Sequence, residues 1–188
     1  MDFMSDIERS LQVLRKGGII LYPTDTIWGI GCDATNKSAV EKIVSLKKRP
    51  EKKGLIVLIA DEKDLFHYTS QPDPAVLNYL EKTEKPTTVI YDGMVNLAGN
   101  LSEDGSIAIR LVKDSFCRHL IRRLKKPLVS TSANISGSPA PRFFEEISTE
   151  IRLGVDYIFK YRQDDHSLYL PSSLVKFSRD GTITVIRP

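Results

Sequence analysis

Hydroxyl and amide side chains are concentrated in one short stretch of the 188-residue chain, Ser130-Thr131-Ser132-Ala133-Asn134-Ile135-Ser136-Gly137. The stretch directly follows the apolar run Pro127-Leu128-Val129, which predicts a buried strand. Ligands of open α/β sheets bind beyond the carboxyl ends of strands, and short hydroxyl side chains beside bare backbone N–H groups suit a compact polar or anionic ligand. The alternative is an ordinary turn whose Ser, Thr and Asn side chains bond their own backbone.

Two cations, Lys47 and Arg49, stand two residues apart where a predicted helix ends before Pro50. The chain leaves helical geometry there, so both side chains can face one site. Arginine offers a bidentate fork for phosphate or carboxylate, and lysine offers a point charge. The alternative is that these residues only complement the C-terminal dipole of the helix.

Arg110 ends a predicted strand in which Ile107 and Ile109 occupy one face, so it lies on the opposite face with Ser106. An arginine on a covered sheet needs an anionic partner, because an unpaired buried charge is very costly. That partner is either a structural Asp or Glu, or a ligand. Thr24 and Thr26 point the same way if their segment is extended, and a turn built on their hydroxyls is the alternative.

Strands and helices alternate along the chain, and we expect one α/β domain over residues 1–188, with flanking helices on a twisted open mixed sheet. Apolar runs predict strands at 19–22, 29–32, 55–60, 87–91, 106–111, 127–129 and 157–159, and a hairpin of 173–177 and 182–186 around Asp180-Gly181. Residues at helical spacing predict five helices. The first begins at a Ser5–Glu8 capping box and has the inner face Ile7, Leu11 and Leu14. The inner faces of the others are Val40, Ile43, Val44 and Lys47; Val76, Leu77 and Leu80, in a helix that begins at Asp73-Pro74; Phe116, Leu120, Ile121 and Leu124, in a helix capped by Asp114; and Phe143, Phe144, Ile147 and Ile151.

Composition excludes several classes of protein. With 41% hydrophobic and 27% charged residues the chain is an ordinary globular domain, and it has no apolar run of membrane-spanning length and no signal peptide, so we expect a cytoplasmic protein without a membrane partner. The spacing of Cys32 and Cys117 matches no metal-binding motif, so we expect both to be reduced thiols that behave as small hydrophobic side chains. The histidines form no metal-like group, so no protein-bound metal is expected. Walker and dinucleotide fingerprints are absent, so a nucleotide would be held by scattered cations and hydroxyls.

Three motifs together resemble the threonylcarbamoyl-AMP synthase family, the YrdC-like domain, in its short single-domain bacterial form. They are Tyr22–Gly31, Lys47-Lys48-Arg49-Pro50 with Lys53-Gly54-Leu55-Ile56, and Ser130–Gly137. Pro171–Val175 and Ile186-Arg187-Pro188 are similar to the closing segments of the family. The resemblance covers nearly the whole chain and implies a YrdC-like fold with a central concave basic pocket.

The resemblance also implies a nucleotidyltransferase reaction, in which L-threonine, bicarbonate and ATP, with Mg²⁺, give threonylcarbamoyl-AMP and pyrophosphate. A downstream threonylcarbamoyl-transferase complex then modifies a tRNA adenosine beside the anticodon. Lys47 and Arg49 match the family's catalytic Lys-x-Arg pair. The threonine contacts fall on Thr26, Arg110, Ser132 and Ser172, and the ATP contacts on Lys47, Arg49, Lys53, Ser106, Asn134, Arg142 and Arg187. Ser132 and Asn134 are expected on one side of an extended segment, with Ser130, Thr131 and Ser136 structural.

The alternative function is a non-catalytic RNA-binding module of the same fold, which would use a basic surface to hold tRNA or double-stranded RNA. The cations available for it are Lys47, Lys48, Arg49, Lys52 and Lys53, with Arg118, Arg122, Arg123, Lys125 and Lys126. Arg118 and Arg122 would share a helix face. A solvated helix face is the favoured interpretation of the second group.

Overall fold

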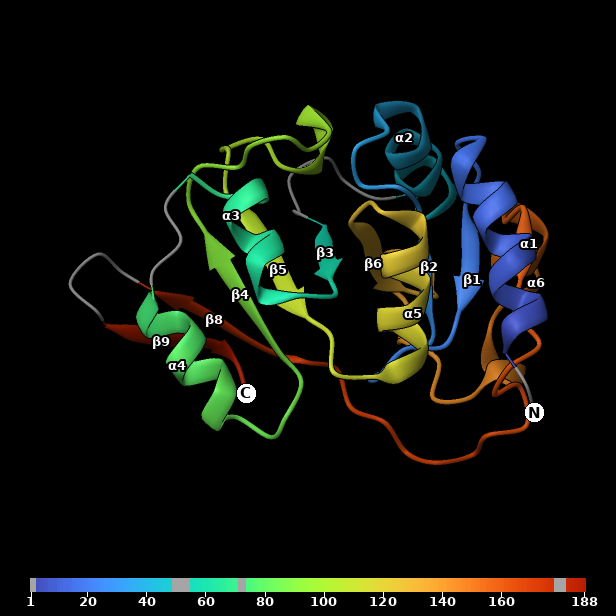
Figure 1. The fold of residues 1–188 in the computed structure, drawn as a ribbon. Coiled ribbons are helices and arrows are strands. Elements are labelled where there is room, and N and C mark those ends of the chain that lie inside the picture. The colour runs from blue at the N-terminus through green and yellow to red at the C-terminus, as the bar shows by residue number, and fades with distance from the viewer. Residues whose placement is uncertain (1–2, 49–54, 71–73, 178–181) are drawn as a thin grey trace.

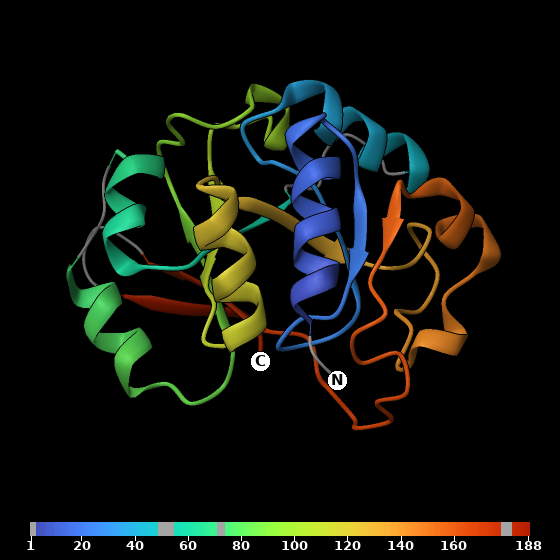
Figure 2. The same ribbon diagram turned by 45° about the vertical axis from the view of Figure 1, so that its right-hand side comes forward.

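The computed structural model describes residues 3–48, 55–70, 74–177 and 182–188, which form helices around a nine-stranded mixed sheet (Figures 1 and 2). The strands are β1 (Ile20–Tyr22), β2 (Gly29–Gly31), β3 (Ile56–Ile59), β4 (Thr87–Tyr91), β5 (Ile107–Leu111), β6 (Leu128–Ser132), β7 (Tyr157–Ile158), β8 (Ser173–Phe177) and β9 (Ile183–Arg187). The helices are α1 (Met4–Arg15), α2 (Lys37–Leu46), α3 (Leu65–Tyr68), α4 (Pro74–Lys82), α5 (Ser115–Leu124) and α6 (Thr149–Gly154), with the 3₁₀ turns η1 (Glu62–Asp64), η2 (Gly99–Leu101) and η3 (Phe144–Glu146). The predicted α/β class and mixed sheet are confirmed.

Strand β6 joins the two halves of the sheet, whose order is β7-β1-β2-β6-β3-β5-β4-β8-β9. It pairs antiparallel with β2, where Gly29 lies opposite Ser132, and antiparallel with β3, where Ile56 lies opposite Ser130. β3 in turn runs parallel to β5, with Leu58 opposite Arg110. The hydroxyl-bearing positions of β6 are therefore separated by a single strand, β3, from the strand that carries Arg110.

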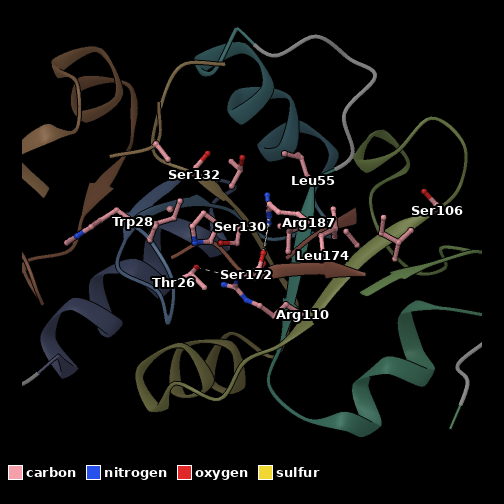
Figure 3. A pocket seen from close by; sticks show the side chains of 18 residues that line it. Thr26, Trp28, Leu55, Ser106, Arg110, Ser130, Ser132, Ser172, Leu174 and Arg187 are labelled. Carbon is pink, nitrogen blue, oxygen red and sulfur yellow. Dashed lines mark hydrogen bonds between the residues drawn. The ribbon is translucent and has the colours of Figure 1, made fainter. Parts of the chain in front are cut away.

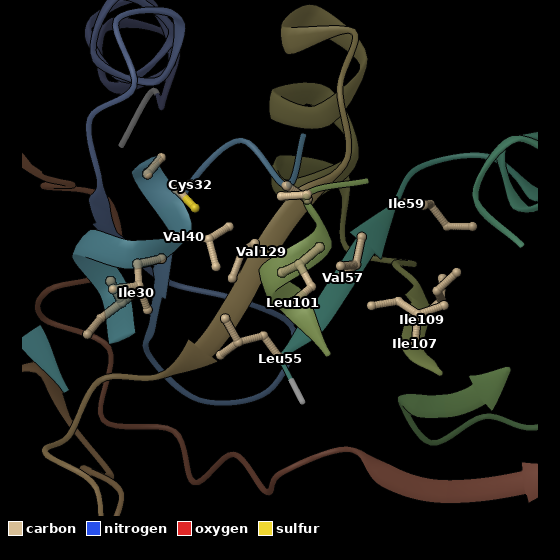
Figure 4. Close-up of a cluster of buried hydrophobic side chains, with 14 of the residues drawn as sticks. Ile30, Cys32, Val40, Leu55, Val57, Ile59, Leu101, Ile107, Ile109 and Val129 are labelled. Carbon is tan, nitrogen blue, oxygen red and sulfur yellow. The ribbon is translucent and has the colours of Figure 1, made fainter. Parts of the chain in front are cut away.

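Apolar side chains fill both faces of the sheet. Alternate residues of β1 point to opposite sides, so that Ile20 and Tyr22 pack under α1 and α5 while Ile19 and Leu21 join the larger cluster. Helices α1 and α5 lie against each other on the first face (Figure 2). The larger cluster contains α2 residues and the strand residues that Figure 4 shows converging from β2, β3, β5 and β6.

Close packing explains a glycine in β2. A Cβ at Gly31 would lie 2.7 Å from the Tyr22 ring and 2.7 Å from the Val129 carbonyl oxygen, well inside van der Waals contact. Polar side chains cap the starts of α2 and α5, and the Asp114 cap of α5 was predicted. Asn36 accepts from the Ala39 N–H at the start of α2, and Asp114 accepts from the Cys117 N–H at 2.8 Å at the start of α5.

Two helix predictions are wrong at their boundaries. The expected Ser5 capping box is absent, because α1 begins at Met4 with Phe3 as an N-cap that makes no side-chain cap bond. The Phe3 ring instead packs 5.5 Å from Phe116, so tertiary contact fixes this end. The single helix predicted around Phe143–Ile151 is interrupted by extended backbone at Ile147, which separates η3 from α6.

The remaining predictions about elements are mostly confirmed. β8 and β9 form the expected antiparallel hairpin, whereas its Asp180-Gly181 turn and Asp73 lie outside the described residues. Cys32 and Cys117 are buried and free. Within the described ranges, every helix is too short or too polar to traverse a bilayer.

The segment 160–172 crosses from the β7 end of the sheet to β8 on the other half (Figures 1 and 2). It carries the chain past the middle of the sheet and delivers Ser172 beside β4. Residues near the C-terminus thereby reach the same region as residues of the first thirty.

Candidate active site

A pocket of about 510 Å³ lies over the central strands, in the size range of small-molecule sites. Its walls come from the loop before β2, from β3, β5 and β6, and from the C-terminal hairpin (Figure 3). The residues that line it are Thr26, Ile27, Trp28, Gly29, Leu55, Ile56, Ile90, Ser106, Ala108, Arg110, Ser130, Thr131, Ser132, Ala140, Pro171, Ser172, Leu174 and Arg187.

Six of the residues predicted to bind substrate line this one pocket, although they are spread over 162 positions of sequence. They are Thr26, Ser106, Arg110, Ser132, Ser172 and Arg187. Figure 3 shows Ser106 at the end of the pocket away from Thr26 and Arg110. The predicted residues are therefore distributed along the pocket and are not gathered at one point.

Arg110 is the most deeply placed cation of the pocket, with 3% of its surface exposed. Its Nη1 donates to the Thr26 hydroxyl at 3.3 Å, and its Nη2 lies 3.0 Å from Asp25 Oδ1. The second contact is an ion pair without hydrogen-bond alignment, so Nε and Nη2 make no hydrogen bond within the described part of the chain. A buried guanidinium with unused donors facing a pocket is suited to bind a carboxylate or phosphate.

The sequence indicated that Arg110 needs an anionic partner, and the structure identifies that partner as Asp25. Burial raises the pKa of the Asp25 carboxyl, and the Arg110 guanidinium opposes that rise. The sequence contains Asp25 directly beside Thr26, but no periodic pattern indicates on which side of that loop its side chain lies.

Thr24 and Thr26 have different roles in the loop before β2. The Thr24 hydroxyl donates to the Ile27 carbonyl at 2.8 Å and accepts from the Thr26 N–H at 3.0 Å, which is the turn expected as the alternative. The two hydroxyls lie 2.9 Å apart. Because the Thr24 proton is used, Thr26 donates to Thr24 and accepts from Arg110, which fixes its hydroxyl at the pocket wall.

Strand β6 contributes Ser130 as well as the predicted Ser132. Ser130 was expected to be structural only. Residues two apart in a strand share a face, so the alternation that placed Ser132 also indicates Ser130. Trp28 likewise lines the pocket, with its ring 5.0 Å from that of Phe144, and no sequence pattern singled it out.

The prediction that Ser132 and Asn134 point to one side of an extended segment is wrong. β6 ends at Ser132, and the Asn134 N–H folds back to the Ser132 carbonyl at 2.9 Å. The Asn134 amide donates to the Ser138 carbonyl at 2.6 Å, and its Oδ1 makes no hydrogen bond among the described residues. Asn134 therefore lies in a turn beside the pocket and does not belong to the residues that line it.

The Lys47 side chain binds the turn that contains Asn134. It is the C-cap of α2, it is 1% exposed, and its Nζ donates to the Ser132 carbonyl at 2.5 Å and the Asn134 carbonyl at 2.6 Å. The Lys47 carbonyl accepts from the Ser136 N–H at 2.9 Å. The end of α2 and the loop after β6 are thus bound together by one side chain.

The closing segments of the chain supply Ser172 and Arg187. The Arg187 guanidinium donates to the Ser172 carbonyl through Nε at 3.0 Å and Nη2 at 2.8 Å. The Ser172 hydroxyl shares a 2.8 Å hydrogen bond with that of Thr88. These contacts attach the segment 160–172 to the sheet at the pocket.

Two of the predicted ATP contacts, Ser106 and Arg142, already have acidic partners within the protein. The Ser106 hydroxyl donates to Asp104 at 2.6 Å, and hydrogen bonds from Ser106 and Ser102 lower the pKa of Asp104 to about 2. Arg142 pairs with Glu146 at 2.6 Å and lines a smaller cavity behind Thr26 and Trp28. Arg49 and Lys53 lie outside the described residues.

The pocket as described carries two arginines and six Ser or Thr residues, and no Asp or Glu is among its lining residues. Such donors recognise carboxylate and phosphate oxygens. The chemistry that this arrangement supports is alignment and charge stabilisation of anionic reactants, as in adenylyl transfer.

Comparison with known proteins agrees with this chemistry. A family model for the Sua5, YciO and YrdC proteins, described as "Telomere recombination", matches residues 12–188. A protein of Vibrio parahaemolyticus named threonylcarbamoyl-AMP synthase is 35% identical over 152 residues, which cover 79% of this chain and 82% of that protein. A protein of the same name from Idiomarina loihiensis is 35% identical over 161 residues, covering 82% and 86%.

Solved structures share the fold. P. abyssi Sua5 complexed with L-threonine superposes with a TM-score of 0.85 at 21% identity, covering 98% of this chain and 54% of that one. E. coli YciO gives 0.79 at 26% identity, covering 97% and 88%. Full-length HypF in a phosphate- and nucleotide-bound form gives 0.83 at 22% identity, covering 96% and 28%. The chain thus spans about half the length of the P. abyssi protein. On the extent of these matches, the chain belongs to the Sua5/YciO/YrdC family.

Proposed function

We propose that the chain is an L-threonylcarbamoyladenylate synthase, which forms threonylcarbamoyl-AMP and pyrophosphate from L-threonine, bicarbonate and ATP. The observation that carries the proposal is the buried Arg110, held by Thr26 in a hydroxyl-lined pocket with unused guanidinium donors. Support comes from relatives of about the same length that are named threonylcarbamoyl-AMP synthase.

The amino acid occupies the Arg110 end of the pocket in this proposal. The threonine carboxylate pairs with Arg110, and the hydroxyls of Thr26, Ser132 and Ser172 hold its remaining polar groups. A related fold, P. abyssi Sua5, has been solved with L-threonine, which supports an amino-acid site in this architecture.

ATP occupies the other end, toward Ser106, with Arg187 in the middle of the pocket beside Ser172 (Figure 3). The proposed contacts comprise Lys47, Arg49, Lys53, Ser106, Asn134, Arg142 and Arg187. HypF, which shares the fold, has been solved in a nucleotide-bound form. Lys47 acts on the nucleotide side by fixing the turn at Asn134, since its Nζ is bonded to two carbonyls of that turn.

The reaction needs no covalent nucleophile. The threonine amine and bicarbonate form a carbamate with loss of water, a carbamate oxygen attacks the α-phosphorus of ATP, and pyrophosphate leaves. Because no carboxylate lines the described pocket, Mg²⁺ is assigned to the ATP phosphates and supplies charge neutralisation there. The protein's part is to align the reactants and to surround the phosphates with positive charge.

The product is proposed to serve tRNA modification in the cytoplasm, through a downstream threonylcarbamoyl-transferase complex.

The alternative function, a non-catalytic RNA-binding module, has less support than the synthase, because the arginines on the surface of α5 pair with acidic residues. Arg122 pairs with Asp61, and Arg123 pairs with Glu8 at 2.5 Å. Cations that pair with acidic neighbours present less net positive charge to a phosphate backbone.

Release of pyrophosphate tests the proposal directly. Purified protein is incubated with ATP, Mg²⁺ and bicarbonate, with L-threonine or L-serine as the amino acid. We expect threonine-dependent release that collapses in Lys47→Ala, Arg49→Ala and Asn134→Ala.

Lys48→Ala is the matched control, because Lys48 is an exposed neighbour that pairs with Glu150 at 2.7 Å on the surface. It should retain wild-type release. Protein that binds tRNA but releases no pyrophosphate, with all variants indistinguishable from wild type, would establish the RNA-binding alternative instead.

A further inference from the structure

We propose that Asp25 is a positioning residue for the amino-acid site, whose carboxylate holds the Arg110 guanidinium in the orientation that receives a substrate carboxylate. The inference rests on the proposed function and adds a residue to it. Asp25 does not appear among the described pocket-lining residues, and it reaches the site only through Arg110.

The geometry of Arg110 shows why a second anchor is needed. Thr26 binds Nη1 from one side at 3.3 Å, which alone leaves the guanidinium free to turn about that contact. Asp25 meets Nη2 at 3.0 Å, so two neighbouring residues of one loop grip the two terminal nitrogens. Since the Asp25 contact is not aligned with an N–H bond, the group is held without consuming all of its donors.

Burial makes the ion pair effective. The side chains of Arg110 and Asp25 are only 4% and 12% exposed, so water screens their attraction weakly. Burial raises the pKa of Asp25 and Arg110 counteracts it, as expected for a carboxylate that is kept close to this cation. A carboxylate at this depth is difficult to explain as a solvated surface group.

The loop that carries Asp25 is itself braced from behind. Arg162 Nη1 donates to the Thr24 carbonyl at 3.5 Å, and its Nη2 pairs with Asp114 at 2.9 Å. Asp114 therefore supports this loop through Arg162, and its negative charge contributes to the raised pKa of Asp25. Asp61, whose carboxylate pairs with Arg122 on the surface of α5, offers a control for Asp25 outside this network.

Isothermal titration calorimetry with L-threonine and, separately, with ATP tests the inference. Asp25→Asn removes the charge at nearly constant shape, and we expect the Kd for threonine to rise about tenfold or more while the Kd for ATP changes less than about twofold. Asp25→Glu, which keeps the charge on a longer side chain, should fall between wild type and Asp25→Asn. Asp61→Asn, which breaks an Asp–Arg ion pair on the surface of α5, should bind threonine within about twofold of wild type.

Threonine affinity of Asp25→Asn within twofold of wild type would overturn the inference, as would an equal loss of ATP affinity. If Asp25→Asn does not fold, Asp25→Glu decides alone, and wild-type threonine affinity in that variant contradicts a positioning role. If the wild-type protein binds no threonine, the proposed function itself is contradicted. This outcome is distinguishable from one in which the wild type binds threonine and Asp25→Asn binds it equally well, which contradicts only the role of Asp25.

Discussion

At the level of single residues, the proposed amino-acid site depends on one buried ion pair, Arg110 with Asp25. Strand alternation predicted the face that Arg110 occupies, and Ser106 and Arg110 do line the pocket together. Its partner was not predictable, because Asp25 lies in a loop without periodicity and the contact spans 85 positions. Electrostatics predicts that a buried arginine needs an anionic partner, but only the fold shows which residue that partner is.

Arg110→Met should lower the free energy of unfolding by about 3 kcal/mol near neutral pH, because it leaves Asp25 buried without a counter-ion. The double variant Asp25→Asn/Arg110→Met should recover much of that loss. Urea denaturation of the wild type, both single variants and the double variant measures the coupling.

The destabilisation of Arg110→Met should shrink at acid pH. The pKa of Asp25 is already raised by burial, and loss of the opposing guanidinium raises it further. The ionised carboxylate is the unfavourable form in the folded state, so stability is recovered as pH falls through the folded-state pKa. Equal destabilisation at all pH values, or additive effects in the double variant, would contradict a coupled pair.

At the scale of elements, the site depends on where β6 stops. The strand pattern correctly places Ser132, and it also indicates Ser130, which was assigned to structure alone. The pattern fails at Asn134 because the chain turns back after Ser132, and a period of two no longer describes it. Extended backbone at Ile147 likewise interrupts the single helix predicted there. A new helix, α6, begins after it, where the Ser148 hydroxyl accepts a hydrogen bond from the Ile151 N–H.

Lys47→Met should destabilise the protein by about 2 to 3 kcal/mol and abolish pyrophosphate release. The variant keeps the apolar stem but leaves carbonyls of Ser132 and Asn134 without their buried cationic donor. Thermal unfolding and the release assay measure the two effects.

Lys48→Met provides the comparison, because this side chain is 65% exposed and should cost little stability. A Lys47→Met protein with wild-type stability would show that the contacts of Lys47 with the turn are unimportant. Its activity would then report a direct role on ATP alone.

At the scale of the whole molecule, the pocket exists because of strand order. Local patterns predicted nearly every strand, but they carry no information on which strands become neighbours. β6 lies between β2 and β3, and the crossing segment 160–172 brings Ser172 and Arg187 to the residues of the first loop. The family resemblance supplied this long-range arrangement, and the fold confirms that six predicted residues meet in one pocket.

The proposed synthase must join threonine, bicarbonate and ATP in one product. Incorporation of labelled bicarbonate into an adenylate, compared with the pyrophosphate released in the same reaction, tests this requirement. We expect one labelled carbon per pyrophosphate, strictly dependent on L-threonine and lost in Arg110→Lys, whose point charge cannot reproduce the guanidinium fork. Pyrophosphate released without labelled adenylate, or labelled product formed without threonine, would contradict it.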